Sequence, residues 1–178
     1  REMQLVFQLP KESFDSGKTL GSGIGESLRN SGLKRKEVRE KVAELLSTCG
    51  LTPNFAERYP GEVSGGECQR AAIARALAVE PSLLICDEAT SALDVTVQKQ
   101  VAEELLFMRK TYNTAMILVT HNIGVVRMMA DRILVLQNGQ AREYGETEAV
   151  LDHPKDPYTK KLMSSVLHLK RAENQEVR

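Results

Sequence analysis

Two apolar runs of the sequence end in polar residues whose types suit metal and proton chemistry. Asp87 and Glu88 come directly after LLIC, and His121 comes directly after ILVT. A carboxylate in such a place can hold Mg²⁺ directly or through water, and its neighbour can orient and deprotonate an attacking water molecule. These residues predict a hydrolytic site, although a carboxylate pair that caps the helix after a strand has the same pattern.

A glycine turn lies upstream of the carboxylates, in the segment VSGGE at residues 63–67. Ser64, Gly65 and Gly66 precede a stretch rich in Ala, Arg and Leu, which is typical of a helix. Because the glycines have no Cβ, backbone N–H groups and the helix N-terminus can approach phosphate oxygens there. The segment indicates a phosphate-binding turn, and an ordinary glycine turn is the alternative.

Alternating strands and helices are predicted to position these residues. Short apolar runs indicate strands at residues 3–8, 82–86, 115–120 and 132–137, the last of which ends at a strong Asn–Gly turn signal. Helices are predicted at residues 33–48, 67–79, 95–110 and 122–130, from apolar spacing and composition. Two short helices are expected within residues 146–166, around a loop at 154–157, and the tail beyond residue 169 is expected to fray.

This alternation predicts an α/β fold with a largely parallel sheet and helices on both of its faces. In open parallel sheets, ligands bind beyond the carboxyl ends of the strands, where loops and helix N-termini converge. Asp87, Glu88 and His121 follow two of the predicted strands. We therefore expect them to lie at one edge of the sheet, around one bound anion.

The order of these motifs resembles that of a known family. VSGGE, LLICDE, SALD and the strand that ends at His121 resemble the signature motif, Walker B motif, D-loop and switch histidine of ABC ATPases. The resemblance covers residues 8–121 and implies a P-loop NTPase-like fold with a helical signature subdomain. It also implies that Asp87 contacts Mg²⁺, that Glu88 is the catalytic base and that His121 holds the γ-phosphate of ATP.

The same resemblance implies nucleotide-binding roles for further residues. Gln8 looks like the Q-loop glutamine, which lies at the nucleotide and metal site and links it to the membrane partner. The signature turn, Ser64, Gly65 and Gly66 followed by Glu67, would bind the γ-phosphate of the opposite subunit, and Asp94 would lie at the dimer interface. The expected cofactors are ATP and Mg²⁺, and function is expected to require a dimer.

Two features depart from the family pattern. Glu67 stands where the family usually has Gln, so a carboxylate is expected near phosphate unless it points away, and hydrolysis would be weakened. No segment matches the Walker A pattern GxxxxGK[ST], so we expect the chain to be incomplete at its N-terminus and to turn over little ATP in isolation. The segment GKT at residues 17–19 resembles the end of that pattern, but Glu12 occupies the place of its first glycine.

The C-terminal region supplies a clue to the branch of the family. HPKDPYTKKLMSSV at residues 153–166 is similar to the HPxHPYT segment of oligopeptide, dipeptide and nickel importer ATPases, although a proline-bounded turn before a helix is the alternative. We expect an ABC ATPase domain at residues 1–152, with a helical subdomain at about residues 20–80, and an importer-type tail at residues 153–178. The implied function is an ATP-hydrolysing subunit that energises import of peptides or nickel.

The importer resemblance also implies partners and a location. Transmembrane permease subunits, a second ATP-binding subunit and, indirectly, a substrate-binding protein are the expected partners. The expected location is peripheral, at the cytoplasmic face of the cell membrane. No nucleic-acid partner is expected, because 24 Lys and Arg balance 24 Asp and Glu and aromatic residues make up only 4% of the chain.

Composition narrows the remaining alternatives. Three cysteines without a CxxC pair indicate neither a disulfide framework nor a zinc site. No apolar run reaches the roughly 18 residues that a membrane-spanning helix needs. A non-transport ABC ATPase is one alternative function, but the coiled coil or basic linker expected of such proteins is not found in this sequence. A catalytically inactive fragment that serves only as a dimerisation module is the other.

Overall fold

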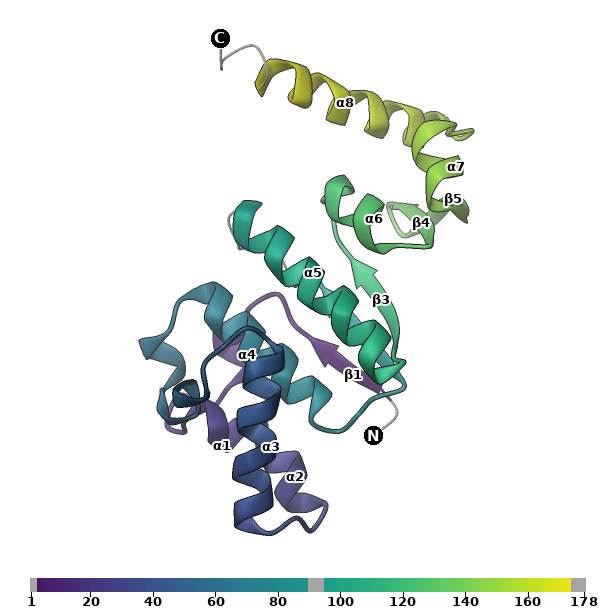
Figure 1. The fold of residues 1–178 in the computed structure, drawn as a ribbon. Helices are drawn as coiled ribbons and strands as arrows, with labels where there is room; N and C mark the ends of the chain where they lie inside the picture. The colour runs from purple at the N-terminus through teal and green to yellow at the C-terminus, as the bar shows by residue number, and fades with distance from the viewer. Residues whose placement is uncertain (1–2, 90–94, 174–178) are drawn as a thin grey trace. The chain divides into compact units, whose positions relative to one another are not determined.

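The computed structural model describes residues 3–89 and 95–173 (Figure 1). The chain groups into two compact units, Arg1–His121 and Asn122–Arg178. The first unit contains a parallel sheet and most of the helices, and the second contains a β-hairpin followed by helices. The division predicted at residues 152 and 153 rests on motifs rather than on compactness, and it stays a prediction.

A three-stranded parallel sheet forms the centre of the first unit. Its strands are Met3–Val6 (β1), Leu83–Asp87 (β2) and Ala115–Val119 (β3), in the order β1-β2-β3. The register pairs Val6 with Cys86 and Asp87 with Val119. The predicted α/β fold with a parallel sheet is therefore confirmed, and β1 ends two residues earlier than predicted.

The helices between β1 and β2 pack against one another (Figure 1). They are Leu20–Ile24 (α1), Glu26–Asn30 (α2), Arg35–Thr48 (α3) and Gly65–Leu77 (α4). The apolar residues of α3 recur at helical spacing, which places them on one face, and all of them are buried: Val38, Val42, Leu45 and Leu46. Ile73 and Leu77 of α4 are buried as well. This segment is the helical part of the fold that the sequence predicts.

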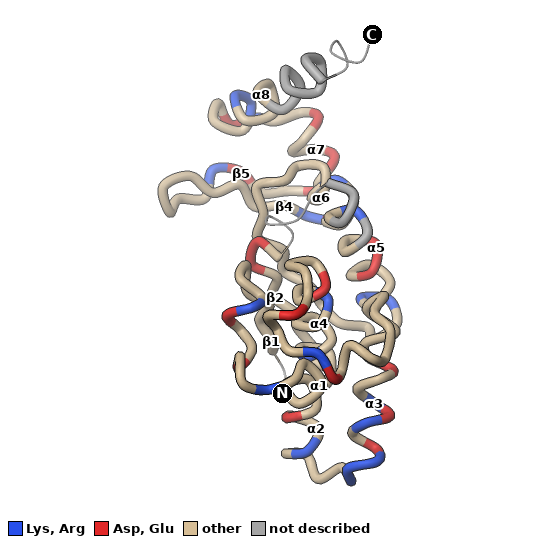
Figure 2. The backbone as a smooth tube through the Cα atoms, turned by 90° about the vertical axis from the view of Figure 1, so that its left-hand side faces the viewer, with Lys and Arg blue, Asp and Glu red and all other residues tan. Residues whose placement is uncertain are grey.

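The exposed side of α3 carries charges of both signs along its length (Figure 2). Lys41 Nζ lies 3.1 Å from Glu44 Oε1, and Lys36 Nζ lies 3.9 Å from Glu40 Oε1. Pairs of this kind on a helix surface contribute little to stability, about 0.3–0.5 kcal/mol each. The burial of the apolar face of α3 therefore does most to hold this helix in place.

The helix that connects β2 to β3 is Val95–Tyr112 (α5). It buries Val101, Leu105 and Met108, which again recur at helical spacing. Just after it, the buried Thr114 donates a hydrogen bond from its hydroxyl to the carbonyl of Pro81, at 2.9 Å. Because Pro81 precedes β2 and Thr114 precedes β3, this bond ties the starts of the two strands together.

One face of the parallel sheet is open. Met3 and Leu5 of β1 and Ile117 and Val119 of β3 are each between 41% and 58% exposed, whereas Val6 on the other face is 2% exposed. Helix α4 packs against β1. The expectation that helices cover both faces of the sheet is therefore wrong for the part of the chain that the structure describes.

The second unit is built around an antiparallel hairpin. Arg132–Gln137 (β4) pairs with Gln140–Glu146 (β5), and the turn between them has positive φ at Asn138 (52°) and Gly139 (74°). Two successive residues with positive φ are what a two-residue hairpin turn requires. The sequence predicts this turn, but it does not predict β5. The expectation that β4 belongs to the parallel sheet is wrong, because β4 pairs only with β5 in the described residues.

The remaining elements of this unit are the helices Ile123–Met129 (α6), Thr147–Asp152 (α7) and Pro157–Glu173 (α8). Helix α8, the second of the two expected here, is longer than predicted and continues to Glu173. The expectation that the chain frays beyond residue 169 is therefore wrong for residues 170–173. Within the described ranges, no helix is both long enough and apolar enough to cross a membrane.

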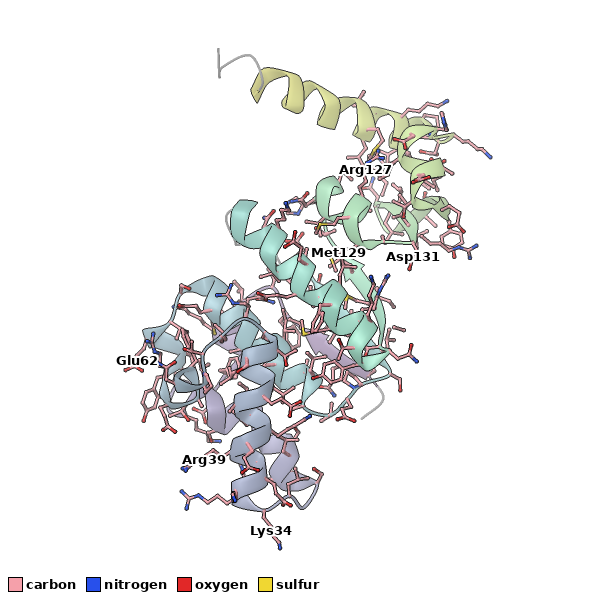
Figure 3. The ribbon with its side chains drawn as sticks, in the orientation of Figure 1. Lys34, Arg39, Glu62, Arg127, Met129 and Asp131 are labelled. Atoms are coloured by element: carbon pink, nitrogen blue, oxygen red, sulfur yellow. The ribbon has the colours of Figure 1, made fainter. Side chains whose placement is uncertain are left out.

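The loop between α7 and α8 is anchored by carboxylates. Glu143 of β5 accepts hydrogen bonds from the backbone N–H groups of Lys155 (2.8 Å) and Asp156 (3.2 Å). Asp156 in turn accepts from the backbone of Tyr158 at 2.7 Å, which caps the start of α8. Arg127, labelled in Figure 3, binds Asp152 through two hydrogen bonds of 2.6 and 3.1 Å and links α6 to α7.

Candidate functional site

The parallel sheet brings three distant segments to one edge. Because β1, β2 and β3 are parallel, their carboxyl ends lie on the same side of the sheet. Gln8 follows β1 by two residues, Asp87 ends β2, and His121 follows β3 by two residues. The polar residues that the sequence places after apolar runs therefore meet at this edge.

Glu88 is the centre of this cluster. Its Oε2 accepts a hydrogen bond from Nε2 of Gln8 at 2.9 Å, and its Oε1 lies 3.1 Å from Nδ1 of His121. The Glu88 side chain is 31% exposed and the His121 side chain is 73% exposed. The carboxylate is thus held from both sides and still reaches solvent, as a group that must meet a water molecule needs to do.

The backbone at Glu88 is itself unusual. Its φ is 46°, in the left-handed region that residues other than glycine seldom adopt. Its N–H donates to the carbonyl of Val119 at 2.9 Å, so the neighbouring strand β3 holds the residue in this conformation. Residues kept in such conformations by their surroundings are enriched at functional sites.

A hollow of about 410 Å³ opens beside the cluster. Its lining includes Asp87 and Gln8 together with Glu12 and Ser13, all of which carry oxygen atoms. Oxygen ligands are those that Mg²⁺ prefers, and it usually takes only one or two carboxylates and completes its shell with water and phosphate. The oxygen donors of this lining therefore suit Mg²⁺. In the described residues no group of three or more His, Cys, Asp or Glu is placed to enclose a metal.

Glu12 and Ser13 were not identified from the sequence as site residues. They belong to a 3₁₀ helix at Pro10–Ser13, directly after Gln8. Pro10 at its start is a recognisable signal for a short helical turn, but nothing in the sequence shows that this turn folds back beside Asp87. A larger hollow, of about 650 Å³, lies in the second unit and is lined by residues of β5, α7 and the loop after it.

The glycine turn forms the start of α4. Ser64 is the N-cap, and its hydroxyl accepts from the backbone N–H of Glu67 at 3.3 Å. Gly65 is exposed, and a Cβ added to it would meet no atom within 4 Å. Gly65 therefore lies at the surface, and the hydrogen bonds described for Ser64 and Glu67 remain within the turn rather than reaching Glu88.

The remaining candidates from the sequence are Asp94 and the segment GKT at residues 17–19. Asp94 lies outside the described residues. Lys18 forms an exposed ion pair with Asp15 at 3.3 Å, and Thr19 caps α1 by accepting from the N–H of Ser22 at 3.2 Å. The segment at residues 17–19 is thus a turn that starts a helix. Cys49, Cys68 and Cys86 are buried, and burial raises the pKa of Cys86 to about 12.

Comparison with known proteins agrees with this arrangement of motifs. The oligopeptide transport ATP-binding protein OppF of Escherichia coli (strain K12) is 44% identical over 167 residues, which are 93% of this chain and 50% of the relative. The di/tripeptide transport ATP-binding protein DppF of Pseudomonas aeruginosa is 40% identical over 166 residues, 93% of this chain and 51% of the relative. The chain thus spans about half the length of these curated relatives.

Solved structures share the fold. The ATP-binding cassette MJ0796, in a dimeric post-hydrolysis state bound to ADP and Pi, has a TM-score of 0.74 and 28% identity, over 82% of this chain and 63% of that one. CbiO1 from Clostridium perfringens, part of the ABC transporter complex cbiONQ, has a TM-score of 0.78 and 26% identity, over 99% and 68% of the two chains. A family model described as ABC transporter matches residues 1–91. The chain therefore belongs to the ABC transporter family and has the fold of its ATP-binding cassettes.

Proposed function

We propose that this chain is part of an ATP-binding subunit that hydrolyses ATP to drive the import of peptides. The observation that carries the proposal is the Glu88 carboxylate, held between Gln8 at 2.9 Å and His121 at 3.1 Å at the carboxyl edge of the sheet. The family membership and the fold of the cassette bound to ADP and Pi support it. Because the chain spans about half of its relatives, the activity of the whole protein is part of the proposal.

Glu88 is the proposed general base. A carboxylate that is partly exposed and oriented by two neighbours can take a proton from a water molecule that attacks the γ-phosphate. His121, on the other side of that carboxylate, would donate a hydrogen bond to a γ-phosphate oxygen. Asp87 and Gln8 would hold Mg²⁺ beside the hollow that they line. When bound, the metal would neutralise charge that develops on the phosphate oxygens.

A second subunit is proposed to complete the site. The signature turn, Ser64, Gly65 and Gly66, presents surface amides at the start of α4, and helix N-termini favour bound phosphate. Since the hydrogen bonds of this turn remain local, it is proposed to serve a γ-phosphate held by the partner subunit, with Asp94 at the interface. The relative that was solved with ADP and Pi is a dimer, which supports this arrangement.

Peptides are the proposed cargo. The relatives that match 93% of this chain are named for oligopeptide, di/tripeptide and glutathione transport, so peptides are favoured over nickel, the other cargo class that the tail sequence suggests. The proposed partners are transmembrane permease subunits and, through them, a substrate-binding protein. The subunit would then work at the cytoplasmic face of the membrane. No match to the phosphate loop GxxxxGK[ST] lies in these 178 residues, and we propose that they bind ATP weakly by themselves.

Glu88→Gln tests the proposed chemistry in the protein at its natural full length. The Gln side chain has the same shape, and its oxygen can still accept a hydrogen bond from Gln8, so the fold is expected to remain intact. Loss of the base is expected to lower the rate of phosphate release by about 10²- to 10⁴-fold while ATP binding persists.

The matched control is Glu62→Gln. Glu62, labelled in Figure 3, is also an exposed carboxylate, and it accepts a hydrogen bond from the backbone of Tyr59 at 2.8 Å. This variant is expected to turn over ATP at the wild-type rate. Near-normal hydrolysis by Glu88→Gln would remove Glu88 from the role of base, and failure of the wild-type protein to bind ATP would reject the proposed function.

A further inference from the structure

The signature turn of this chain contains a carboxylate whose position the structure makes explicit. Oε2 of Glu67 accepts a hydrogen bond from the backbone N–H of Ser64 at 2.7 Å. The hydroxyl of Ser64 accepts from the N–H of Glu67 at 3.3 Å, so the two residues cap each other at the start of α4. The sequence left open whether Glu67 points away from the turn. In the structure it folds back, and its carboxylate binds the N–H of Ser64, the first amide of the turn.

This reciprocal cap determines which donors remain for an anion. The N–H of Ser64 donates to Glu67, and the N–H of Cys68 donates to the carbonyl of Ser64 at 3.0 Å as the first bond of the helix. Among the described residues, the amides of Gly65 and Gly66 have no such partner. An anion at this turn would therefore bind these two amides within a few ångströms of the Glu67 carboxylate.

The carboxylate remains charged under the conditions in which ATP binds. The N–H of Ser64, and then its side chain, lower the pKa of Glu67 below the ordinary value of 4.5. The charges of Arg58 and Arg70 also lower this pKa, but by less, so two guanidinium groups act electrostatically on the Glu67 carboxylate. Any phosphate at Gly65 and Gly66 meets the attraction of these cations and the repulsion of Glu67 together.

We infer that Glu67 is a built-in electrostatic brake on the binding of the γ-phosphate of ATP by the signature turn, so that two subunits close on ATP less tightly than they otherwise would. The inference rests on the proposed function, because that function brings phosphate to this turn. Glu67 thus has two separable effects: its shape caps α4, and its charge opposes the anion.

The strength of the brake follows from Coulomb's law. A carboxylate about 6 Å from a doubly charged phosphoryl group in water changes affinity by about tenfold. Salt with a Debye length of about 8–10 Å reduces this to about threefold. Removal of the charge is therefore expected to tighten ATP-driven association about three- to tenfold, and the gain is expected to shrink as salt is added.

Two substitutions separate shape from charge. In Glu67→Gln, the side-chain oxygen can still accept from Ser64, since Glu and Gln serve equally in this kind of cap, but the charge is gone. In Glu67→Ala, both the cap and the charge are lost. Thermal unfolding is expected to occur at a slightly lower temperature in the first variant, because the charged cap at the helix N-terminus is lost, and at a clearly lower temperature in the second, because the cap itself is lost as well.

The test measures the ATP concentration that gives half-maximal dimer, by analytical ultracentrifugation. It uses the full-length protein, with its partner ATP-binding subunit where there is one, and all variants carry Glu88→Gln so that ATP is not consumed. Glu67→Gln is expected to lower this concentration three- to tenfold at low salt and by less at about 1 M salt, where the Debye length is about 3 Å.

The outcomes distinguish the inference from the function on which it rests. If dimers form with ATP but Glu67→Gln needs as much ATP as the protein with Glu67, or more, Glu67 is only a helix cap and the inference is wrong while the proposed function stands. A gain that does not change with salt also contradicts an electrostatic brake. If ATP produces no dimer in any variant, the proposed function fails, and the inference fails with it.

Discussion

Replacing Gly21 with Ala is expected to disturb the packing of α1 against the 3₁₀ helix at Pro53–Glu57. Gly21 lies within α1, and a Cβ built on it would lie 2.7 Å from the carbonyl oxygen of Ala56 and 2.8 Å from its Cβ. Separations below 3.0 Å are not tolerated, so one of the two segments must move. The nearest atom belongs to the backbone, and relief therefore requires a shift of the whole 3₁₀ helix.

Two opposing effects determine the size of the change. Ala is favoured over Gly inside a helix by about 1 kcal/mol. Overpacking costs about 1–3 kcal/mol, and a clash with backbone belongs at the upper end of that range. The net loss is therefore about 2 kcal/mol. In a protein of this size each kcal/mol moves the unfolding midpoint by about 2–4 °C, so Tm is expected to fall by about 4–8 °C.

Thermal unfolding followed by circular dichroism measures this effect, with Gly61→Ala as the matched control. A Cβ at Gly61 would meet no atom within 4 Å, and this glycine is not among those with positive φ. The control is expected to change stability by no more than about 0.5 kcal/mol, as is usual for surface positions. Equal unfolding midpoints for the two variants would refute the close approach of α1 to Ala56.

Two further predictions concern titrating groups. The N–H of Lys155 does most to lower the pKa of Glu143 in the folded protein, so on acidification the unfolded chain protonates this carboxylate first. The charge of Glu143 therefore stabilises the fold above pH 4.5, and this stabilisation is lost as the pH falls below that value. In thermal unfolding, wild type is expected to be more stable than Glu143→Gln above pH 4.5, and the difference is expected to vanish at lower pH. Burial raises the pKa of Cys86 and Cys49 from 9.0 to about 12. Because the thiolate is the reactive form, its fraction at pH 8 falls about a thousandfold. The reaction of these thiols with Ellman's reagent is therefore expected to be about a thousandfold slower in the folded protein than in guanidinium. Equal rates in the two conditions would show that these thiols are accessible.

The sequence predicted that Asp87, Glu88 and His121 lie at one edge of the sheet because their position follows from topology, whereas Gln8 was assigned from the resemblance to ABC ATPases. Short apolar runs that alternate with helices must form parallel strands, and parallel strands place the residues after them at one edge. His121 lies 33 positions after Glu88, and Gln8 lies 80 positions before it, yet both reach its carboxylate. No details of side-chain packing are needed for that expectation.

The features that the sequence did not predict depend on local chemistry without a strong apolar signal. The segment QAREYGE forms β5, although it is mostly polar and contains a glycine, because β4 offers it a partner across the Asn138 turn. The open face of the sheet is another case. Leu5 and Ile117 are apolar in a pattern that suits a strand buried on both sides, and the sequence alone cannot show which face is covered.

The two halves of the proposed site have different physical origins, and this difference explains why one subunit is not expected to be enough. Sheet topology assembles Gln8, Glu88 and His121, whereas a helix cap forms the signature turn, and the hydrogen bonds of Ser64 and Glu67 do not leave that turn. In the arrangement that we propose, a phosphate that needs both the carboxylate edge and the glycine amides is shared between two chains. Because Glu67 acts only on the second of these contacts, its charge would affect association and leave proton transfer at Glu88 unchanged.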